Sequence, residues 1–352
     1  MGINLKILIT GNMGYVGSVL SSFLHKKIEF CQVIGFDTGF FGHSLTDLKL
    51  YPDLSLIAQC FGDVRDIRPD QLEGVDAVVH LAAISNDPMG NEFEEVTSEI
   101  NRFASVRLIK LAAQAGVKNF VFASSCSMYG QADGRSRKEG DLLNPLTAYA
   151  KSKVGVEEDV KKLNLGKMVF TSLRFATACG WSPRLRLDLV LNDFVACAIT
   201  SKKITVLSDG TPWRPLIDVE DMCRAITWGL TRKSDNGGEF LAVNTGCNEN
   251  NYQVRDLAEA VASMISGTEI SINSHAISDN RSYSVDFSLY KKLAPNYQPQ
   301  IIIRKSIERI RDGLLSIGFN DAKFRESNYI RLNILRQHIN MKRVDANLRW
   351  LP

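Results

Sequence analysis

Tyr149 and Lys153 have the types and spacing needed for acid–base chemistry. They lie four positions apart in residues 148–163, a stretch whose pattern predicts a helix, so their side chains share one helix face. A free tyrosine titrates near ~10, and a neighbouring ammonium group favours the phenolate. The pair would therefore supply a base that takes a proton from a hydroxyl group at neutral pH. Because surface helices also offer this spacing by chance, the surrounding elements must decide.

The elements that position this pair follow a repeating pattern. Amphipathic stretches such as residues 95–115 alternate with short apolar runs, which cover residues 6–10, 32–36, 60–66, 75–83, 117–123 and 168–174. Near-continuous apolar strands are typical of a parallel sheet that is buried on both faces. The alternation predicts an α/β fold, a Rossmann-type doubly wound parallel sheet. The fifth strand would deliver Ser124 and Ser125 to the carboxyl edge, where ligands of such sheets bind.

Gly11, Gly14 and Gly17 form a loop between the first predicted strand and a helix. Glycines there permit a tight turn and the close approach of a pyrophosphate, while the helix N-terminus supplies N–H groups. Asp37 ends the second strand, about 20 positions farther on, where a carboxylate holds a ribose diol and repels a 2′-phosphate. The pattern favours NAD over NADP. Asp63, after the third strand, would accept a hydrogen bond from the adenine amino group or be a solvated carboxylate.

The composition excludes several classes of protein. The chain has 352 residues, 45% of them hydrophobic, and a net charge of +3, which fits a globular protein with more than one domain and gives no basic stripe for nucleic acid. Seven scattered cysteines without a Cys-x-x-Cys pair indicate reduced thiols, and five histidines without ligand spacing indicate no metal site. His80, inside the fourth strand, is expected to be a core histidine. Neither a signal peptide nor an apolar run of spanning length is found, so we expect a cytoplasmic protein that binds no membrane.

Taken in order along the chain, these motifs resemble the extended short-chain dehydrogenase/reductase family. More narrowly, they resemble its NAD-dependent nucleotide-sugar epimerase and dehydratase branch, with a likeness to UDP-glucose 4-epimerases. The residues that carry the resemblance are Gly11-x-x-Gly14-x-x-Gly17, Asp37, His80-Leu81-Ala82-Ala83, Asn101, Ser124-Ser125-Cys126-Ser127-Met128-Tyr129-Gly130 and Tyr149-x-x-x-Lys153. The resemblance also implies a homodimer formed through the helices at about 100–115 and 148–163, and a role in polysaccharide or glycoconjugate biosynthesis.

The resemblance implies a role for each matching residue. Tyr149 is implied as the base that takes the hydroxyl proton, Lys153 as the residue that holds the nicotinamide ribose and lowers the tyrosine pKa, and Ser125 as a hydrogen-bond partner of the reacting oxygen. The implied NAD-binding residues are Gly11, Met13, Gly14, Tyr15, Val16, Gly17, Asp37, Asp63, Val64, Leu81, Ala82, Ala83, Asn101, Ser124, Tyr149, Lys153 and Phe175. The implied residues for the nucleotide-diphosphate sugar are Ser85, Asn86, Ser127, Arg184, Asn192, Arg214 and Arg281. Among the latter, Arg214 and Arg281 suit a diphosphate because a guanidinium group binds phosphate oxygens in pairs.

Cys126 and Ser127 depart from the dehydratase pattern. The sugar-nucleotide 4,6-dehydratases carry an Asp and a Glu at these two places, and neither Cys nor Ser removes water efficiently at neutral pH. The sequence therefore predicts an NAD-dependent epimerase that forms a transient keto-sugar, with C4 as the expected position. Net redox by a nucleotide-sugar 4-ketoreductase or 4-dehydrogenase is the alternative, since it would use the same three residues. A non-catalytic NAD-binding protein is less favoured because those residues are intact.

The domain organisation follows from the same resemblance. Residues 1–175 are expected to form the NAD-binding domain, with segments at about 217–245 returning to it. Residues 176–352 are expected to form a smaller, discontinuous substrate-binding domain and a C-terminal helical extension. From residue 318 this extension interleaves basic and apolar side chains, which favours an amphipathic helix on the protein body over a nucleic-acid arm.

Overall fold

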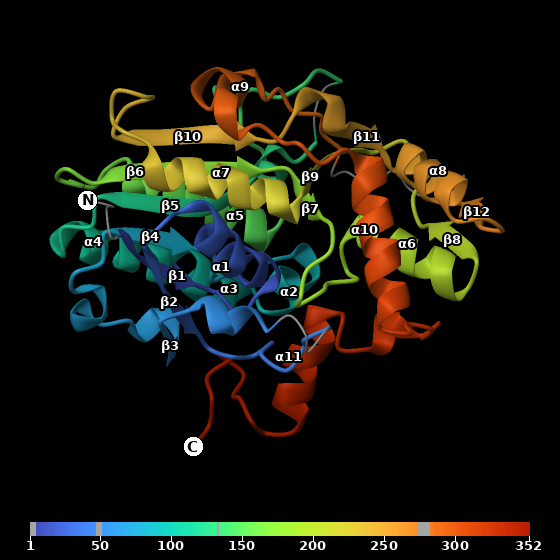
Figure 1. Ribbon diagram of the computed structural model, residues 1–352, viewed down its shortest axis with the longest axis horizontal. Helices are drawn as coiled ribbons and strands as arrows, with labels where there is room; N and C mark the ends of the chain where they lie inside the picture. Colours follow the sequence, from blue (N-terminus) through green and yellow to red (C-terminus); the bar gives the residue numbers. More distant parts are fainter. Residues whose placement is uncertain (1–4, 47–50, 132–133, 274–281) are drawn as a thin grey trace.

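A seven-stranded parallel sheet forms the centre of the protein (Figure 1). The structure, a computed structural model, describes residues 5–46, 51–131, 134–273 and 282–352. The strand order is β10-β6-β5-β4-β1-β2-β3. The bounds are Leu5–Thr10 for β1, Cys31–Asp37 for β2, Ala58–Phe61 for β3, Ala77–His80 for β4, Asn119–Ser125 for β5, Val169–Phe175 for β6 and Phe240–Thr245 for β10. The predicted Rossmann-type doubly wound sheet is confirmed.

Helices cover both faces of the sheet because successive strand residues point to opposite sides. In β1, Ile7 and Ile9 belong to one apolar core cluster and Leu8 to the other. The helices α1 (Tyr15–Lys27) and α7 (Val219–Thr231) contribute to the first cluster. The helices α4 (Ser105–Gln114) and α5 (Ala148–Val160) contribute to the second. The strands are therefore buried on both faces, and their carboxyl ends share one edge.

Two predicted elements differ in detail from the structure. The third strand ends at Phe61, not at residue 66, because Asp63 caps a 3-10 turn by accepting a hydrogen bond from the Arg65 backbone N–H at 2.8 Å. The predicted helix 95–115 consists of α3 (Glu94–Ser98), a π-helical turn (Glu99–Ala104) and α4. Such π-turns often mark functional sites, and this one contains Asn101.

Several of the remaining elements form a smaller body beside the sheet, around a third apolar cluster. One three-stranded sheet contains β7 (Thr177–Cys179), β9 (Trp213–Asp218) and β11 (Asn251–Gln253), and a two-stranded sheet contains β8 (Lys203–Val206) and β12 (Glu269–Ile272). The other helices are α2 (Asp87–Glu92), α6 (Val190–Thr200), α8 (Val254–Met264), α9 (Ser288–Leu293), α10 (Ile303–Ser316) and α11 (Arg331–Asn340). Of these, Tyr290 of α9 belongs to the first cluster, and Met89 of α2 and Leu335 of α11 belong to the second. In the described residues, no helix has both the length and the hydropathy needed to cross a membrane.

The C-terminal segment returns to the large sheet. Figure 1 shows α11 and the residues after it along the β3 edge of the molecule. Val344 and Leu348 are buried in the cluster that contains Leu8, and the Trp350 indole Nε1 donates to the Thr38 carbonyl oxygen at 2.7 Å. The segment is thereby attached to the loop that follows β2.

Candidate active site

A cavity of about 860 Å³ lies at the carboxyl edge of the sheet. Its walls come from residues at the ends of β1, β2, β4, β5 and β6, and from segments of the smaller body. The volume is in the upper part of the range for small-molecule and cofactor sites, and its place is where open parallel sheets bind ligands.

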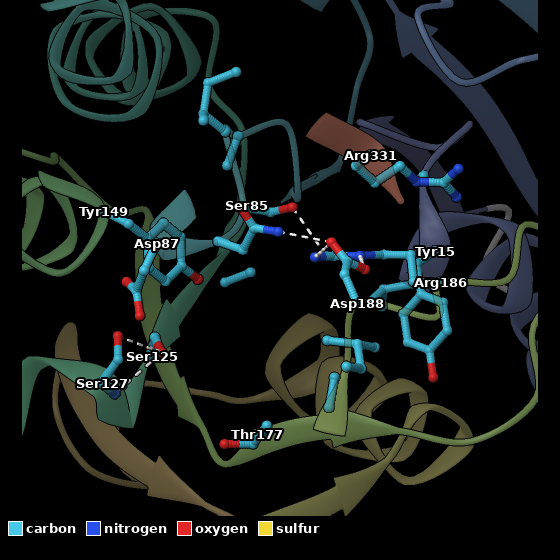
Figure 2. Close-up of a pocket in the computed structure, with 18 of the residues that line it drawn as sticks. Tyr15, Ser85, Asp87, Ser125, Ser127, Tyr149, Thr177, Arg186, Asp188 and Arg331 are labelled. Atoms are coloured by element: carbon cyan, nitrogen blue, oxygen red, sulfur yellow. Dashed lines mark hydrogen bonds and ion pairs between the residues drawn. The ribbon is translucent and has the colours of Figure 1, made fainter. Parts of the chain in front are cut away.

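Tyr149 and Ser125 both line this cavity, and Figure 2 shows them on one side of it. Ser125 is the last residue of β5, and Tyr149 lies in the first turn of α5. That helix begins after Thr147, whose hydroxyl accepts a hydrogen bond from the Ala150 N–H at 3.2 Å, as an N-cap does. The Ser125 hydroxyl donates to the Ser127 hydroxyl at 2.9 Å. A strand end and a capped helix start thus bring two hydroxyl groups to one place.

Lys153 lies behind Tyr149 on the same helix, as predicted. Its side chain is 3% exposed, and its Nζ donates to the Ala123 carbonyl oxygen at 2.6 Å. The Nζ is 4.6 Å from the ring centroid of Phe122 and 5.5 Å from that of Tyr149. Burial lowers the pKa of Lys153 to about 7, although the negative charge of Glu157 opposes this shift.

The expected effect of Lys153 on the pKa of Tyr149 is not found. Burial raises the pKa of Tyr149 to about 12, while a hydrogen bond with Ser125 and the charge of Arg186 lower it and the charge of Asp87 raises it. The reason is geometric: the lysine ammonium lies over the face of the tyrosine ring and points to the Ala123 carbonyl. Ser125 is therefore the predicted residue whose contact favours the phenolate in this structure.

The glycine loop fits a dinucleotide. Gly11 has a φ of +78°, and a Cβ there would lie 2.6 Å from the Ala82 backbone nitrogen. A Cβ on Gly17 would lie 2.5 Å from the Gly11 carbonyl oxygen. Side chains at these positions would clash with backbone, so the loop keeps an open cradle over the N-terminus of α1. The predicted cofactor residues that line the cavity are Gly11, Gly14, Tyr15, Val16, Gly17, Asp37, Asp63, Val64, Leu81, Ala82, Ala83, Ser124, Tyr149, Lys153 and Phe175.

Asp37 is held by backbone donors at the cavity wall. One carboxylate oxygen accepts from the Met13 N–H at 3.0 Å and the other from the Gly39 N–H at 2.8 Å, while burial raises the pKa of the group. Two predicted cofactor residues, Met13 and Asn101, do not line the cavity. Met13 offers its N–H to Asp37, and the Asn101 amide makes two hydrogen bonds, of 2.8 and 2.9 Å, to the backbone of Ile84. The hydrogen bonds of these two residues thus position Asp37 and the backbone of Ile84, which both line the cavity.

The predicted substrate residues divide into two groups. Ser85, Asn86, Ser127 and Arg214 line the cavity, whereas Arg184 and Asn192 do not. Arg184 is fully buried and forms an ion pair of 2.8 Å with Asp53. The fully buried Asn192 side-chain amide accepts a hydrogen bond from the Gly180 N–H and donates to the Arg186 carbonyl oxygen. Neither side chain lines the cavity in this structure, so their expected contact with the substrate stays a prediction. Arg281 lies outside the described residues.

Sequence reasoning missed several polar residues of the cavity. Arg186 binds Asp188 through two hydrogen bonds of 2.9 Å and donates to the Ser85 hydroxyl at 3.0 Å (Figure 2). Asp87 accepts a hydrogen bond of 2.7 Å from the Thr147 hydroxyl. The segment that contains Arg186 and Asp188 has neither helix nor strand structure, so no periodicity could tell which of its side chains face the ligand.

Cys126 and His80 belong to the core. The Cys126 thiol is fully buried and donates to the Arg174 carbonyl oxygen at 3.0 Å, and burial raises its pKa. His80 is 1% exposed, its two ring nitrogens lie 2.6 and 2.7 Å from the hydroxyls of Thr10 and Ser105, and burial lowers its pKa to about 3. Neither residue lines the cavity. The prediction that His80 is a satisfied core histidine is confirmed.

Comparison with known proteins agrees with this arrangement. The model of the NAD dependent epimerase/dehydratase family matches residues 7–246. Relatives include the uncharacterized UDP-glucose epimerase YtcB of Bacillus subtilis, 33% identical over 233 residues, which are 63% of this chain and 72% of that protein. UDP-glucuronic acid decarboxylase 1 of Arabidopsis thaliana is 28% identical over 318 residues, which are 87% of this chain and 69% of that protein.

Solved structures share the fold. The UDP-glucuronic acid 4-epimerase of Bacillus cereus, in complex with UDP-glucuronic acid and NAD, superposes with a TM-score of 0.74 at 24% identity. The alignment covers 89% of this chain and 100% of that chain.

Proposed function

We propose that this chain, which belongs to the NAD-dependent epimerase/dehydratase family, is an epimerase of a nucleotide-activated sugar. It is an enzyme, and its cofactor is NAD. The observation that supports the proposal most is the convergence of Tyr149 and Ser125 on the cavity, with Lys153 behind them. A phenol, a hydroxyl and an amine around one position are what reversible oxidation of a carbinol requires.

The proposed reaction begins with the transfer of a proton to the phenolate form of Tyr149, which burial opposes and which the hydrogen bond with Ser125 and the charge of Arg186 favour. The proton leaves a ring hydroxyl of the sugar, with C4 the proposed position, and the carbon–oxygen bond becomes a ketone. NAD, when bound, accepts the hydride from the same carbon and returns it. Ser125 orients the reacting oxygen by a hydrogen bond. The keto-sugar turns over in the cavity, and the proton on Tyr149 returns to the oxygen as the other face of the carbon is reduced.

Binding is proposed to divide the cavity between its two ligands. The glycine loop and Asp37 would hold the diphosphate and the adenosine ribose of NAD. Ser85, Asn86 and Arg186 lie where they could contact the sugar, and Arg214 is retained as a ligand of the substrate diphosphate. Because both ligands would share one cavity, the keto-sugar would stay bound until the hydride returns.

Oxidative decarboxylation is a second candidate, favoured by the similarity to a UDP-glucuronic acid decarboxylase. It would share the first step, in which Tyr149 takes the hydroxyl proton and bound NAD would accept the hydride, after which the 4-keto uronic acid would lose CO₂. Elimination of water needs a further acid or base, and Cys126 is too deeply buried to serve. Asp87 is a carboxylate that lines the same cavity as Tyr149, and its charge raises the pKa of Tyr149. Because a carboxylate could serve as the acid or base of an elimination, the test also looks for dehydrated products.

The test begins with protein purified without added cofactor. Denaturation and chromatography of the released nucleotides should give NAD. The protein should then interconvert UDP-glucose and UDP-galactose, or UDP-glucuronate and UDP-galacturonate, without added NAD, as followed by proton NMR. A substrate deuterated at C4 should keep its deuterium in the product, because the same hydride returns. Release of CO₂, loss of water, or a requirement for stoichiometric NADH or NADPH would contradict the epimerase assignment. These outcomes would indicate a decarboxylase, a dehydratase and a reductase, respectively.

A further inference from the structure

Glu157 is a buried carboxylate that the proposed reaction does not use. It lies in α5, one helical turn beyond Lys153, and its side chain is only 2% exposed. Lys153 is 3% exposed, so both side chains belong to the face of the helix that packs against the sheet. Glu157 does not line the cavity. A buried charge costs free energy unless partners compensate it, so the contacts of Glu157 indicate its role.

Two strands supply the partners of the Glu157 carboxylate. Its Oε1 accepts hydrogen bonds from the Ser124 hydroxyl of β5 at 2.8 Å and from the Ser172 hydroxyl of β6 at 2.7 Å. Arg174 of β6 donates to Oε2 from Nη2 at 2.7 Å and from Nε at 3.1 Å. The parallel register of the two strands sets Arg174 opposite Ser124. The carboxylate is therefore fixed to the ends of two neighbouring strands, and α5 is fixed with it.

The end of β5 holds Lys153 as well. The Lys153 Nζ donates to the Ala123 carbonyl oxygen at 2.6 Å, and the next residue, Ser124, binds Glu157. Two consecutive strand residues thus bind two side chains that lie one turn apart on α5. Burial lowers the pKa of Lys153 to about 7, and the charge of Glu157 acts in the opposite direction. Loss of that charge should therefore leave the amine largely neutral at neutral pH.

Further titratable groups surround the ion pair. The Arg174 Nη1 donates to the Tyr129 hydroxyl and to the Glu139 carbonyl oxygen, both at 3.1 Å. The charges of Glu157 and Arg174 also act on the Cys126 thiol. Burial raises the pKa of Tyr129 and of Cys126, so both are uncharged at neutral pH. Arg174 and the carboxylates of Glu139 and Glu157 therefore carry the charge of this cluster, and of these Glu157 lies on α5.

We propose that Glu157 is a positioning residue of the active site, which holds the Lys153 amine beside Tyr149 in its charged form. An ammonium group is a stronger hydrogen-bond donor than a neutral amine, and the family resemblance implies that Lys153 holds the nicotinamide ribose. The part of the proposal that concerns NAD rests on that contact. The effect of Glu157 on Lys153 is independent of it and of the sugar reaction.

The first measurement is the titration of Lys153 itself. Protein labelled with ¹³C at the lysine ε-carbons is stripped of NAD and titrated by NMR, and the Lys153 signal is the one absent from Lys153→Met. Glu157→Gln keeps the size of the side chain and removes its charge, so it should lower the midpoint of the Lys153 titration by about one pH unit. Glu158→Gln is the matched control, because Glu158 is the next residue of α5 but is exposed. Its midpoint should stay within about 0.2 pH units of the natural protein.

The binding of NAD at two pH values separates positioning from a merely structural role. Calorimetry on NAD-stripped protein, without any sugar, gives the Kd. At about pH 8, Glu157→Gln should raise the Kd for NAD about 3- to 10-fold, because the neutral amine must take up a proton when the ribose binds. At about pH 5 the amine is protonated in both proteins, so the two Kd values should agree.

A second variant guards against misfolding of Glu157→Gln, which leaves the Arg174 charge without its partner. Glu157→Gln combined with Arg174→Met removes the whole ion pair, a change that proteins often tolerate. Because Glu157 supplies the charge that acts on Lys153, the double variant should also lower the midpoint of the Lys153 titration.

Three results would overturn the proposal. A Lys153 midpoint that is unchanged in both variants would show that Glu157 does not hold the charge of the amine. A Kd for NAD that rises equally at the two pH values would make the role of Glu157 structural. A lowered midpoint without any change in NAD binding would contradict the contact between Lys153 and the ribose. Both measurements are made without sugar, so a failure of the proposed epimerase reaction would appear separately, in the assay with nucleotide sugars.

Discussion

Replacing Lys153 with Met should increase the free energy of unfolding of the NAD-free protein and should abolish its enzymatic activity. The pKa of Lys153 is about 7 in the folded protein and returns to its ordinary 10.5 on unfolding. This difference corresponds to an unfavourable free energy on the order of 4 kcal/mol at pH 7. The substitution also leaves the Ala123 carbonyl oxygen without its 2.6 Å hydrogen bond, at a cost of about 1–3 kcal/mol. The net expectation is a gain of about 1–3 kcal/mol at pH 7.

The pH dependence gives this prediction its sign. Between pH 7 and 10.5 the unfolded chain carries a proton on Lys153 that the folded protein has lost, so stability from this group rises with pH. The Met variant lacks this slope. Its advantage over the natural protein should therefore be largest near pH 6–7 and should shrink as the pH approaches about 9.5.

Urea unfolding of NAD-stripped protein at several pH values measures the effect. Lys151→Met is the control, since Lys151 lies on the same helix and is exposed; its unfolding free energy should stay within about 0.5 kcal/mol of the natural protein. A Lys153→Met protein that is less stable at pH 7, or whose difference does not depend on pH, would refute the reasoning.

Three further predictions concern the cofactor, the base and the assembly. Tyr149→Phe should lower kcat by about 10²- to 10⁴-fold while NAD remains bound, and retention of activity would remove Tyr149 as the base. Asp37→Ser should raise the Kd for NAD and reduce the ratio of the NADP and NAD dissociation constants, because a carboxylate no longer repels a 2′-phosphate. Titration of the variant with both nucleotides measures the two constants. Phe103, which is 59% exposed in the π-helical turn before α4, would lie in the proposed homodimer interface. Phe103→Glu should give monomers in light scattering, and a natural protein that is already monomeric would contradict the dimer.

Prediction from the sequence succeeded where the local pattern constrains the backbone. The glycine loop, the strand ending in Asp37 and the helix carrying Tyr149 and Lys153 all lie where their patterns indicate. A parallel sheet brings its strand ends to one edge, so residues placed at those ends converge even though they are far apart in the chain.

Prediction failed where side-chain direction depends on packing. The Asn101 and Asn192 amides bind the backbone of other segments, and Arg184 pairs with Asp53, 131 residues away. Local sequence carries no signal for such partners, because the same polar residue types occur in the core and in binding sites. The irregular segment of Arg186 and Asp188 likewise offers no period from which to assign a face.

The sequence by itself determined the fold class and the glycine loop, because these follow from strand and helix periodicity and from glycine geometry, and its resemblance to the family indicated Ser125, Tyr149 and Lys153 as candidate site residues. Only the tertiary structure decided that the lysine ammonium lies over the tyrosine ring, and that Arg186, which donates to Ser85, lines the cavity. Both facts depend on burial and on contacts between distant segments, which a local pattern of residues does not contain.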